Sequence, residues 1–127
     1  MSLYDTRFFF EHYYASNPST LAKTRDELAG RGPRFVSSVT VHEFYKLVLE
    51  KEGRDTAKLR VGLMAKEFTV IPLGTELAVL SAEIRSKHRI PMADSIIMAT
   101  AKMHRLDCVT DDPHLAKAGE AKTRWLR

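Results

Sequence analysis

Carboxylates stand at four widely separated places in this sequence, namely Asp5, Glu43, Asp94 and Asp112. Carboxylates that converge on one point repel one another, so such a site must take up protons or bind a cation. Hard oxygen ligands in that number suit Mg²⁺ or Mn²⁺. A cation of this kind polarises a phosphoryl oxygen and lowers the pKa of its bound water, so the chemistry it supports is phosphodiester hydrolysis.

Asp94 gives the strongest reason to expect a cation. It lies within residues 91–101, a segment that is apolar almost all round at helical spacing. Such a helix is packed on nearly every side, and a buried carboxylate is costly unless it is paired or bound to metal. The helix dipole offers only ~1 kcal/mol near the start of a helix. Asp94 therefore needs a counter-ion, either a basic side chain or a metal.

The other acids leave alternatives open. Asp5 is suited to capping a helix that begins at Thr6. Glu43 lies at the margin of the apolar arc of its helix, where a solvated charge is equally at home. Asp112 and its neighbour Asp111 are typical of an ordinary helix start, where acids meet the positive end of the dipole.

Strand and helix patterns alternate along the chain. Short apolar, β-branched stretches predict strands at residues 2–4, 34–37, 68–71 and 106–109, with a possible edge strand at 123–126. Helical spacing and end signals predict helices near residues 6–15, 19–29, 40–52, 55–66, 75–87 and 91–104, and a short one from about residue 112. This alternation predicts an α/β fold with a four- or five-stranded, mostly parallel sheet covered by helices on both faces.

The predicted elements explain how the acids could meet. In sheets of this kind the ligand crevice lies at the carboxyl ends of the strands. Asp5 follows the first predicted strand directly, Asp112 follows the fourth, and Glu43 lies early in the helix after the second. Asp94 can reach the same edge from the first turn of its helix. We therefore expect one acidic site at this edge.

Composition limits the class of protein. The 127 residues are 44% hydrophobic and 28% charged, which is typical of one globular domain covering residues 1–127. The net charge of +4 and the pI of about 9.3 fit a polyanionic partner such as RNA, although the signal is weak alone. The lone Cys108 excludes an internal disulfide and a cysteine-based zinc site. No apolar run approaches a membrane span, so the expected location is the cytoplasm.

Four segments carry a resemblance to a known family: Leu3–Thr6, Ser38–Glu43, Ala93–Ala101 and Val109–His114. In order and spacing they resemble PIN domains, and most closely the small VapC-type toxins of prokaryotic toxin–antitoxin pairs. The resemblance covers essentially the whole chain. It implies a PIN-like three-layer sandwich and a metal-dependent endoribonuclease that cuts RNA by metal-activated water. It also implies a homodimer that is silenced by a cognate antitoxin protein.

The resemblance further assigns roles to individual residues. The catalytic metal ligands for Mg²⁺ or Mn²⁺ would be Asp5, Glu43, Asp94 and Asp112. Asp112 is preferred to Asp111 because the family pattern of Thr, any residue, Asp reads Thr110-Asp111-Asp112 here. The residues expected to orient the carboxylates are Thr6, Thr110 and Asp111, and those expected to contact substrate are Arg7 and His114.

Two departures from the family pattern bear on activity. Arg7 stands where the family often has a small polar residue, and it could contact phosphate or pair with Glu43 or Asp94 and weaken metal binding. Asp111 adds a fifth acid. Two other functions remain open: a PIN-type RNA-processing nuclease that is not a toxin, and an inactive PIN-like module that binds RNA or protein.

Overall fold

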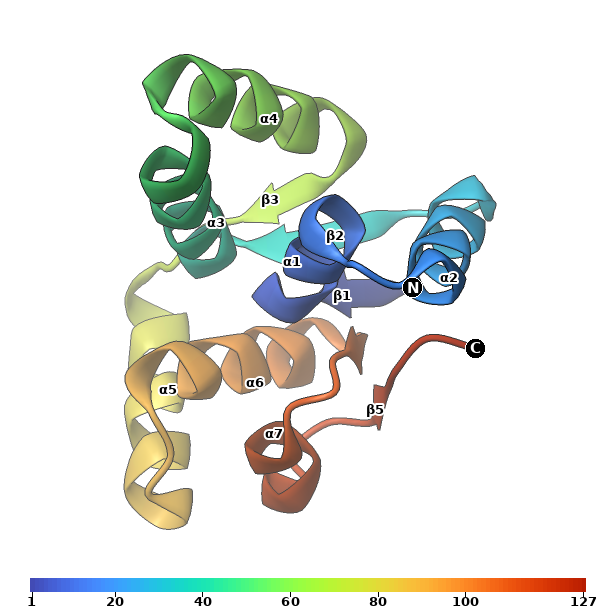
Figure 1. Ribbon diagram of the computed structural model, residues 1–127. Helices are drawn as coiled ribbons and strands as arrows, with labels where there is room; N and C mark the ends of the chain where they lie inside the picture. Colours follow the sequence, from blue (N-terminus) through green and yellow to red (C-terminus); the bar gives the residue numbers. More distant parts are fainter.

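The computed structural model describes residues 1–127 and contains one five-stranded sheet (Figure 1). Its strands are β1 (Ser2–Tyr4), β2 (Arg34–Ser37), β3 (Thr69–Ile71), β4 (Asp107–Val109) and β5 (Thr123–Arg124). They lie in the order β3-β2-β1-β4-β5, and every neighbouring pair is parallel. The α/β prediction is confirmed, and the segment near residue 123 does join the sheet as an edge strand.

Seven helices connect the strands, within a few residues of the predicted positions. They are α1 (Thr6–Tyr14), α2 (Pro18–Ala29), α3 (Ser38–Glu52), α4 (Arg54–Glu67), α5 (Thr75–His88), α6 (Met92–His104) and α7 (Pro113–Ala118). The start of α2 differs from the prediction because Asn17 caps it, accepting a hydrogen bond from the Ser19 amide. Pro18 suits the first helical position, which needs no amide donor. None of these helices has the length and apolar character that crossing a membrane requires.

The sheet has a separate apolar core on each face. Leu3 and Cys108 point to the face covered by α5 and α6, whereas their neighbours Tyr4 and Val109 point to the face covered by α1, α3 and α4. This alternation follows from the two-residue period of a strand. Figure 1 shows α3 and α4 grouped together at the top of the view and α5 and α6 grouped together at the bottom. The molecule is therefore a three-layer sandwich.

The order of the strands places a crevice beside β1. The chain moves outward from β1 to β2 and β3, then returns to the other side of β1 to form β4. The direction of winding thus reverses between β1 and β4. In open α/β sheets, ligands bind outside the carboxyl ends of the strands at such a point.

One carboxylate fastens the C-terminal segment to α5 and α6. The Glu120 side chain is 8% exposed, accepts a hydrogen bond from Lys102 Nζ at 2.6 Å and lies 2.7 Å from His88 Nε2. The bonds from Lys102 and His88 lower the pKa of Glu120 to about 2. The ionised form is therefore favoured in the folded chain.

We expect Glu120→Gln to destabilise the protein at pH 7 by about 1–2 kcal/mol, which is at the low end of the ~1.5–3 kcal/mol usual for a hydrogen bond to a charged group because Lys102 is half exposed. Because the folded pKa lies below the ordinary value of 4.5, this stabilisation is complete above pH 4.5 and is lost as the pH falls toward 2. Urea unfolding of both proteins at pH 7 and pH 3 measures the difference. An undiminished difference at pH 3 would contradict this account.

Candidate metal centre

An open cleft of about 660 Å³ lies at the carboxyl ends of the strands, where the topology places a crevice. All four acids selected from the sequence line it, namely Asp5, Glu43, Asp94 and Asp112. Asp5 directly follows β1, Glu43 comes from α3, Asp94 from α6, and Asp112 precedes α7. Four segments far apart in the sequence thus bring their carboxylates to one place.

Asp5 caps α1 and also lines the cleft, so its capping role does not keep it away from the other acids. Its Oδ1 accepts a hydrogen bond from the Thr6 amide at 2.7 Å, and its Oδ2 accepts one from Thr110 Oγ1 at 2.7 Å. Its own amide donates to the Val109 carbonyl at 3.1 Å, which continues the pairing of β1 with β4. Only 4% of Asp5 is exposed. The carboxylate is therefore held in one orientation.

Thr6 links Asp5 to Glu43. While its amide binds Asp5, its hydroxyl donates to Glu43 Oε1 at 2.7 Å. Glu43 is half-buried one turn into α3, and Ser37 begins this helix by accepting a bond from the Val39 amide. Thr6 therefore stands where it can orient two carboxylates.

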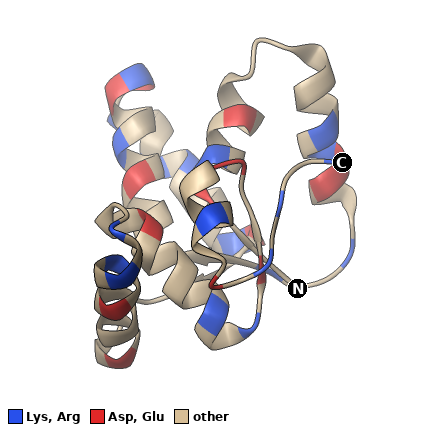
Figure 2. Ribbon diagram, turned by 90° about the horizontal axis from the view of Figure 1, so that it is seen from below, with Lys and Arg blue, Asp and Glu red and all other residues tan.

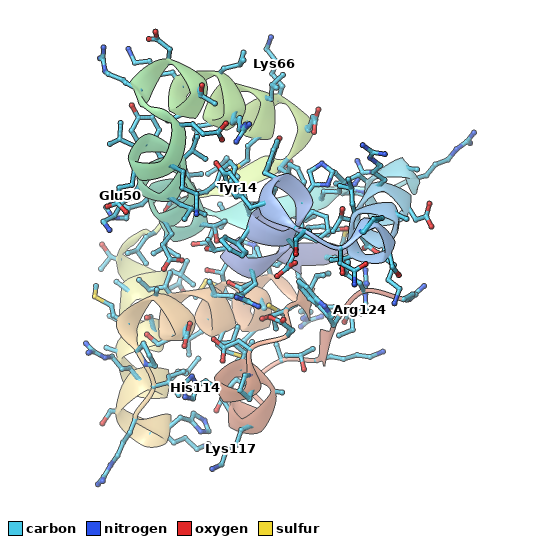
Figure 3. The ribbon with its side chains drawn as sticks, in the orientation of Figure 1. Tyr14, Glu50, Lys66, His114, Lys117 and Arg124 are labelled. Atoms are coloured by element: carbon cyan, nitrogen blue, oxygen red, sulfur yellow. The ribbon has the colours of Figure 1, made fainter.

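Three side chains that could bind a metal, those of Asp94, Asp112 and His114, lie close together near the start of α7. Asp112 caps this helix through the His114 amide at 2.8 Å, and the Asp112 amide donates to Thr110 Oγ1 at 3.0 Å. The ring Nδ1 of His114 lies 3.3 Å from Asp112 Oδ1 and 3.7 Å from Asp94 Oδ2. One ligand atom from each of these three side chains lies within 4.8 Å of the others. Figure 3 shows the His114 side chain beside α7, on the α6 side.

His114 was expected to contact substrate, yet its position also makes it a possible metal ligand. Sequence reasoning did not reach this second role, because a histidine on an exposed first turn carries no sign of its neighbours. The structure shows the contact directly: the His114 amide donates to Asp112 Oδ1, and the His114 ring Nδ1 lies 3.3 Å from the same oxygen.

Burial and mutual repulsion disfavour the charged form of two of the clustered carboxyls. Burial raises the pKa of Asp5 to about 6, and repulsion from Asp94 and Glu43 adds to the shift. Burial also raises the pKa of Asp94 to about 6, with further repulsion from Asp112. No lysine or arginine forms an ion pair with any of the four acids. An oxygen-rich site with uncompensated negative charge is suited to a hard divalent cation.

Arg7 does not neutralise the site, so the suggested pairing with Glu43 or Asp94 is wrong. Its Nε and Nη2 bind the two carboxylate oxygens of Asp111 at 3.0 and 3.2 Å. Asp111, which was expected to orient the other carboxylates, is occupied by this contact instead. The Arg7 guanidinium is half exposed and lines the cleft, where it can meet an incoming phosphate.

Nine further residues line the cleft and were not selected from the sequence, and three of them are aromatic or basic: Phe10, His42 and Lys46. Lys46 stands one turn after Glu43 on α3 and forms an ion pair with Glu50 at 2.9 Å. Helical spacing from Glu43 was the signal that could have found Lys46, because residues three apart share a helix face. These side chains give the acidic cleft a basic and aromatic rim.

Residues 3–121 match the model of the PIN domain family, so the chain belongs to that family. No curated protein matches the chain. The predicted family assignment is confirmed, and the matched region contains all four clustered acids.

Solved structures with the same fold come from toxin–antitoxin systems. VapBC2 of Rickettsia felis, bound to a DNA fragment from its promoter, has 13% identity, a TM-score of 0.80 and coverage of 99% of this chain and 98% of that one. FitAcB of Neisseria gonorrhoeae has 24% identity, a TM-score of 0.77 and coverage of 97% and 96%. The sarcin-ricin-loop-cleaving toxin VapC20 of Mycobacterium tuberculosis has 16% identity, a TM-score of 0.79 and coverage of 94% and 95%. The chain thus shares its fold with these structures over at least 94% of its length.

Proposed function

We propose that this protein is a metal-dependent endoribonuclease. The single observation that carries the proposal is the cleft where Asp5, Glu43, Asp94 and Asp112 meet without a lysine or arginine partner. We assign the metal to these four carboxylates, with His114 as a further possible ligand, and Mg²⁺ or Mn²⁺ as its identity. When bound, the cation supplies Lewis-acid activation of a phosphodiester and of water.

The protein groups around the cation have separate tasks. Thr6 and Thr110 hold the carboxylates of Glu43 and Asp5 by donating hydrogen bonds, so those oxygens need little reorganisation when they bind metal. Arg7 and Lys46 lie at the rim of the same cleft, where they pair with Asp111 and Glu50. We assign them to the phosphates beside the bond that is cut, which would replace those carboxylates as their partners. The apolar floor under Asp94 lowers the local dielectric constant, which strengthens these charge interactions.

Among the biological roles that a ribonuclease can have, the comparisons favour that of a toxin. Structures similar to this chain include toxin–antitoxin complexes. We infer that residues 1–127 form a single nuclease domain that acts on RNA in the cytoplasm and is silenced by a cognate antitoxin. We also infer a homodimer, for which the exposed apolar side chains of Leu73 and Met92, which line one small hollow, offer a contact surface.

Cleavage of a mixed RNA pool by the purified protein tests the proposed activity. We expect cleavage with Mn²⁺ and with Mg²⁺, and none with chelator. Cleavage that continues unchanged in chelator would exclude the metal-dependent mechanism.

The contribution of Arg7 can be separated from that of the carboxylates. We expect Arg7→Ala to raise KM for RNA by about tenfold and to change kcat by less than about threefold, because a phosphate contact made before and during reaction contributes uniform binding. The folded state should lose less than about 1 kcal/mol, since the Arg7–Asp111 pair is exposed. Lys58→Ala, which removes an exposed charge on α4, is the matched control. An unchanged KM would remove Arg7 from the substrate site.

A further inference from the structure

A second hollow, of about 390 Å³, lies at the opposite end of the sheet from the acids. Its walls are α2, the loop of residues 30–33 before β2, and the C-terminal segment from Arg124. Because β1 and β2 begin here and the acidic cleft lies where the strands end, the two sites are on opposite sides of the molecule. Figure 1 shows α2 and the two termini gathered at this end, and Figure 2 shows lysine and arginine positions along α2 and the C-terminal segment.

Positive charge dominates the lining of this hollow. The basic side chains are Lys23, Arg31, Arg34, Arg124 and Arg127, and the acidic ones are Asp26 and Glu27. The other lining residues are mostly polar or glycine, and only two are hydrophobic. The lining therefore differs from the apolar pockets that hold most small organic ligands.

Hydrogen bonds within the protein hold part of the lining in place. Arg124 binds both oxygens of Glu27, at 2.5 and 3.3 Å, and the Tyr4 hydroxyl donates to Glu27 at 2.8 Å. Arg34 donates to the carbonyls of Leu28 and Gly30, which carry no net charge. Figure 3 shows Arg124 at the α2 side of the sheet.

These contacts determine the net charge of the hollow's lining. Arg124 and Glu27 cancel each other, so four cations and one carboxylate are left, with a net charge of +3. Arg34 keeps its positive charge because carbonyl groups hold it in place without neutralising it. The hollow is thus a concentration of like charge that attracts an anion.

Several donors remain available to that anion. Lys23, Arg31 and Arg127 are exposed and make no ion pair within the protein. The amides of Arg31 and Gly32 take part in none of the backbone hydrogen bonds made outside the helices and strands. Gly32 has a φ of +118°, a conformation that side chains rarely adopt, so this loop depends on glycine. Guanidinium, ammonium and free amide groups together are the donors that bind phosphate.

We propose that this hollow binds a backbone phosphate of an RNA strand, away from the acidic cleft. The proposal rests on the proposed ribonuclease function, because that function makes RNA the polyanion the protein meets. Binding at a second point orients the strand across the protein and adds an electrostatic contribution that salt weakens. The hollow therefore contributes to RNA affinity without entering the reaction.

The test is RNA binding in chelator, where no metal-dependent cleavage occurs. The affinity of a fluorescent 20-nucleotide RNA is measured from 50 to 200 mM salt for the unaltered protein and for Lys23→Ala/Arg31→Ala. We expect the double variant to bind about tenfold more weakly, and its slope of log affinity against log salt to fall by about 0.7–1.4, at ~0.7 per lost phosphate contact. Lys58→Ala/Lys66→Ala removes the same charge from exposed positions on α4 and is the matched control.

Equal weakening in the two double variants would overturn the proposal, because only general charge would then matter. Thermal unfolding with inorganic pyrophosphate separates RNA from a free phosphate compound. If pyrophosphate stabilises the unaltered protein but not Lys23→Ala/Arg31→Ala, while both bind RNA equally, the RNA assignment is wrong and the hollow binds small phosphates. Failure of the proposed nuclease would appear separately, as no metal-dependent cleavage by the unaltered protein.

Discussion

Asp94→Asn is expected to reduce RNA cleavage at least about a thousandfold, because removing one anionic metal ligand costs several kcal/mol of transition-state stabilisation and each 1.36 kcal/mol is tenfold in rate. The substitution keeps the shape of the side chain and removes only its charge. Asp94 projects into the cleft from the first turn of α6, and its only ion-pair partner is His114 at 3.7 Å. Single-turnover cleavage of RNA with saturating Mn²⁺ measures the effect directly.

The control for this variant is Glu83→Gln, which removes an exposed carboxylate from α5, outside both the acidic cleft and the basic hollow. We expect the control to cleave RNA within about twofold of the unaltered protein, as surface substitutions away from a site are nearly neutral. Cleavage by folded Asp94→Asn within tenfold of the unaltered protein would show that this carboxylate is not a metal ligand in the reaction.

The same variant is expected to be more stable than the unaltered protein when metal is absent. The pKa of Asp94 is raised to about 6, so the folded state binds this proton more tightly than the unfolded state does. The stability contributed by the protonated form is present below the ordinary value of 3.8 and is lost as the pH rises through 6. Asn cannot ionise and avoids that loss.

We therefore expect Asp94→Asn to match the unaltered protein at pH 4 and to exceed it at pH 7.5 by about 1–2 kcal/mol, after allowance for partial solvent screening. Urea unfolding in chelator at the two pH values gives the difference. Adding Mn²⁺ at pH 7.5 should reverse the order, because a ligand that binds only the folded state stabilises it by mass action. If Asp94→Asn proves less stable at pH 7.5 in chelator, the carboxylate is not under the electrostatic strain described here.

Elements set by local pattern were predicted well. The β-branched run Thr69–Ile71 and the alternation of Leu3 and Tyr4 between the two cores depend on neighbours in sequence, so the strands were placed correctly. The start of α2 was misplaced because both Asn17 and Ser19 are good capping residues, and only the structure shows which one accepts the bond. The short β5 depends on pairing with β4, which is a tertiary contact.

In the site, too, features set by neighbouring residues were predicted, whereas contacts between residues far apart in the sequence were not. The acids were identifiable because Asp5 directly follows β1, Asp112 lies three residues after the end of β4, and parallel strands end at one edge. The Arg7–Asp111 contact joins residues 104 positions apart, and no local pattern encodes such a pair. The basic hollow escaped notice for the same reason, since its wall depends on Arg124 and Glu27, which are 97 positions apart.

Direct titration with Mn²⁺, followed by the loss of its free-ion electron paramagnetic resonance signal, tests most directly whether the clustered carboxylates hold a divalent cation. The titration needs no knowledge of the RNA target. We predict saturable binding to the unaltered protein at pH 7.5, binding at least about tenfold weaker in Asp94→Asn because metal affinity depends on its anionic ligands, and unchanged binding in Glu83→Gln. No saturable binding to the folded, unaltered protein, or equal binding by all three proteins, would contradict the metal centre and with it the proposed nuclease mechanism.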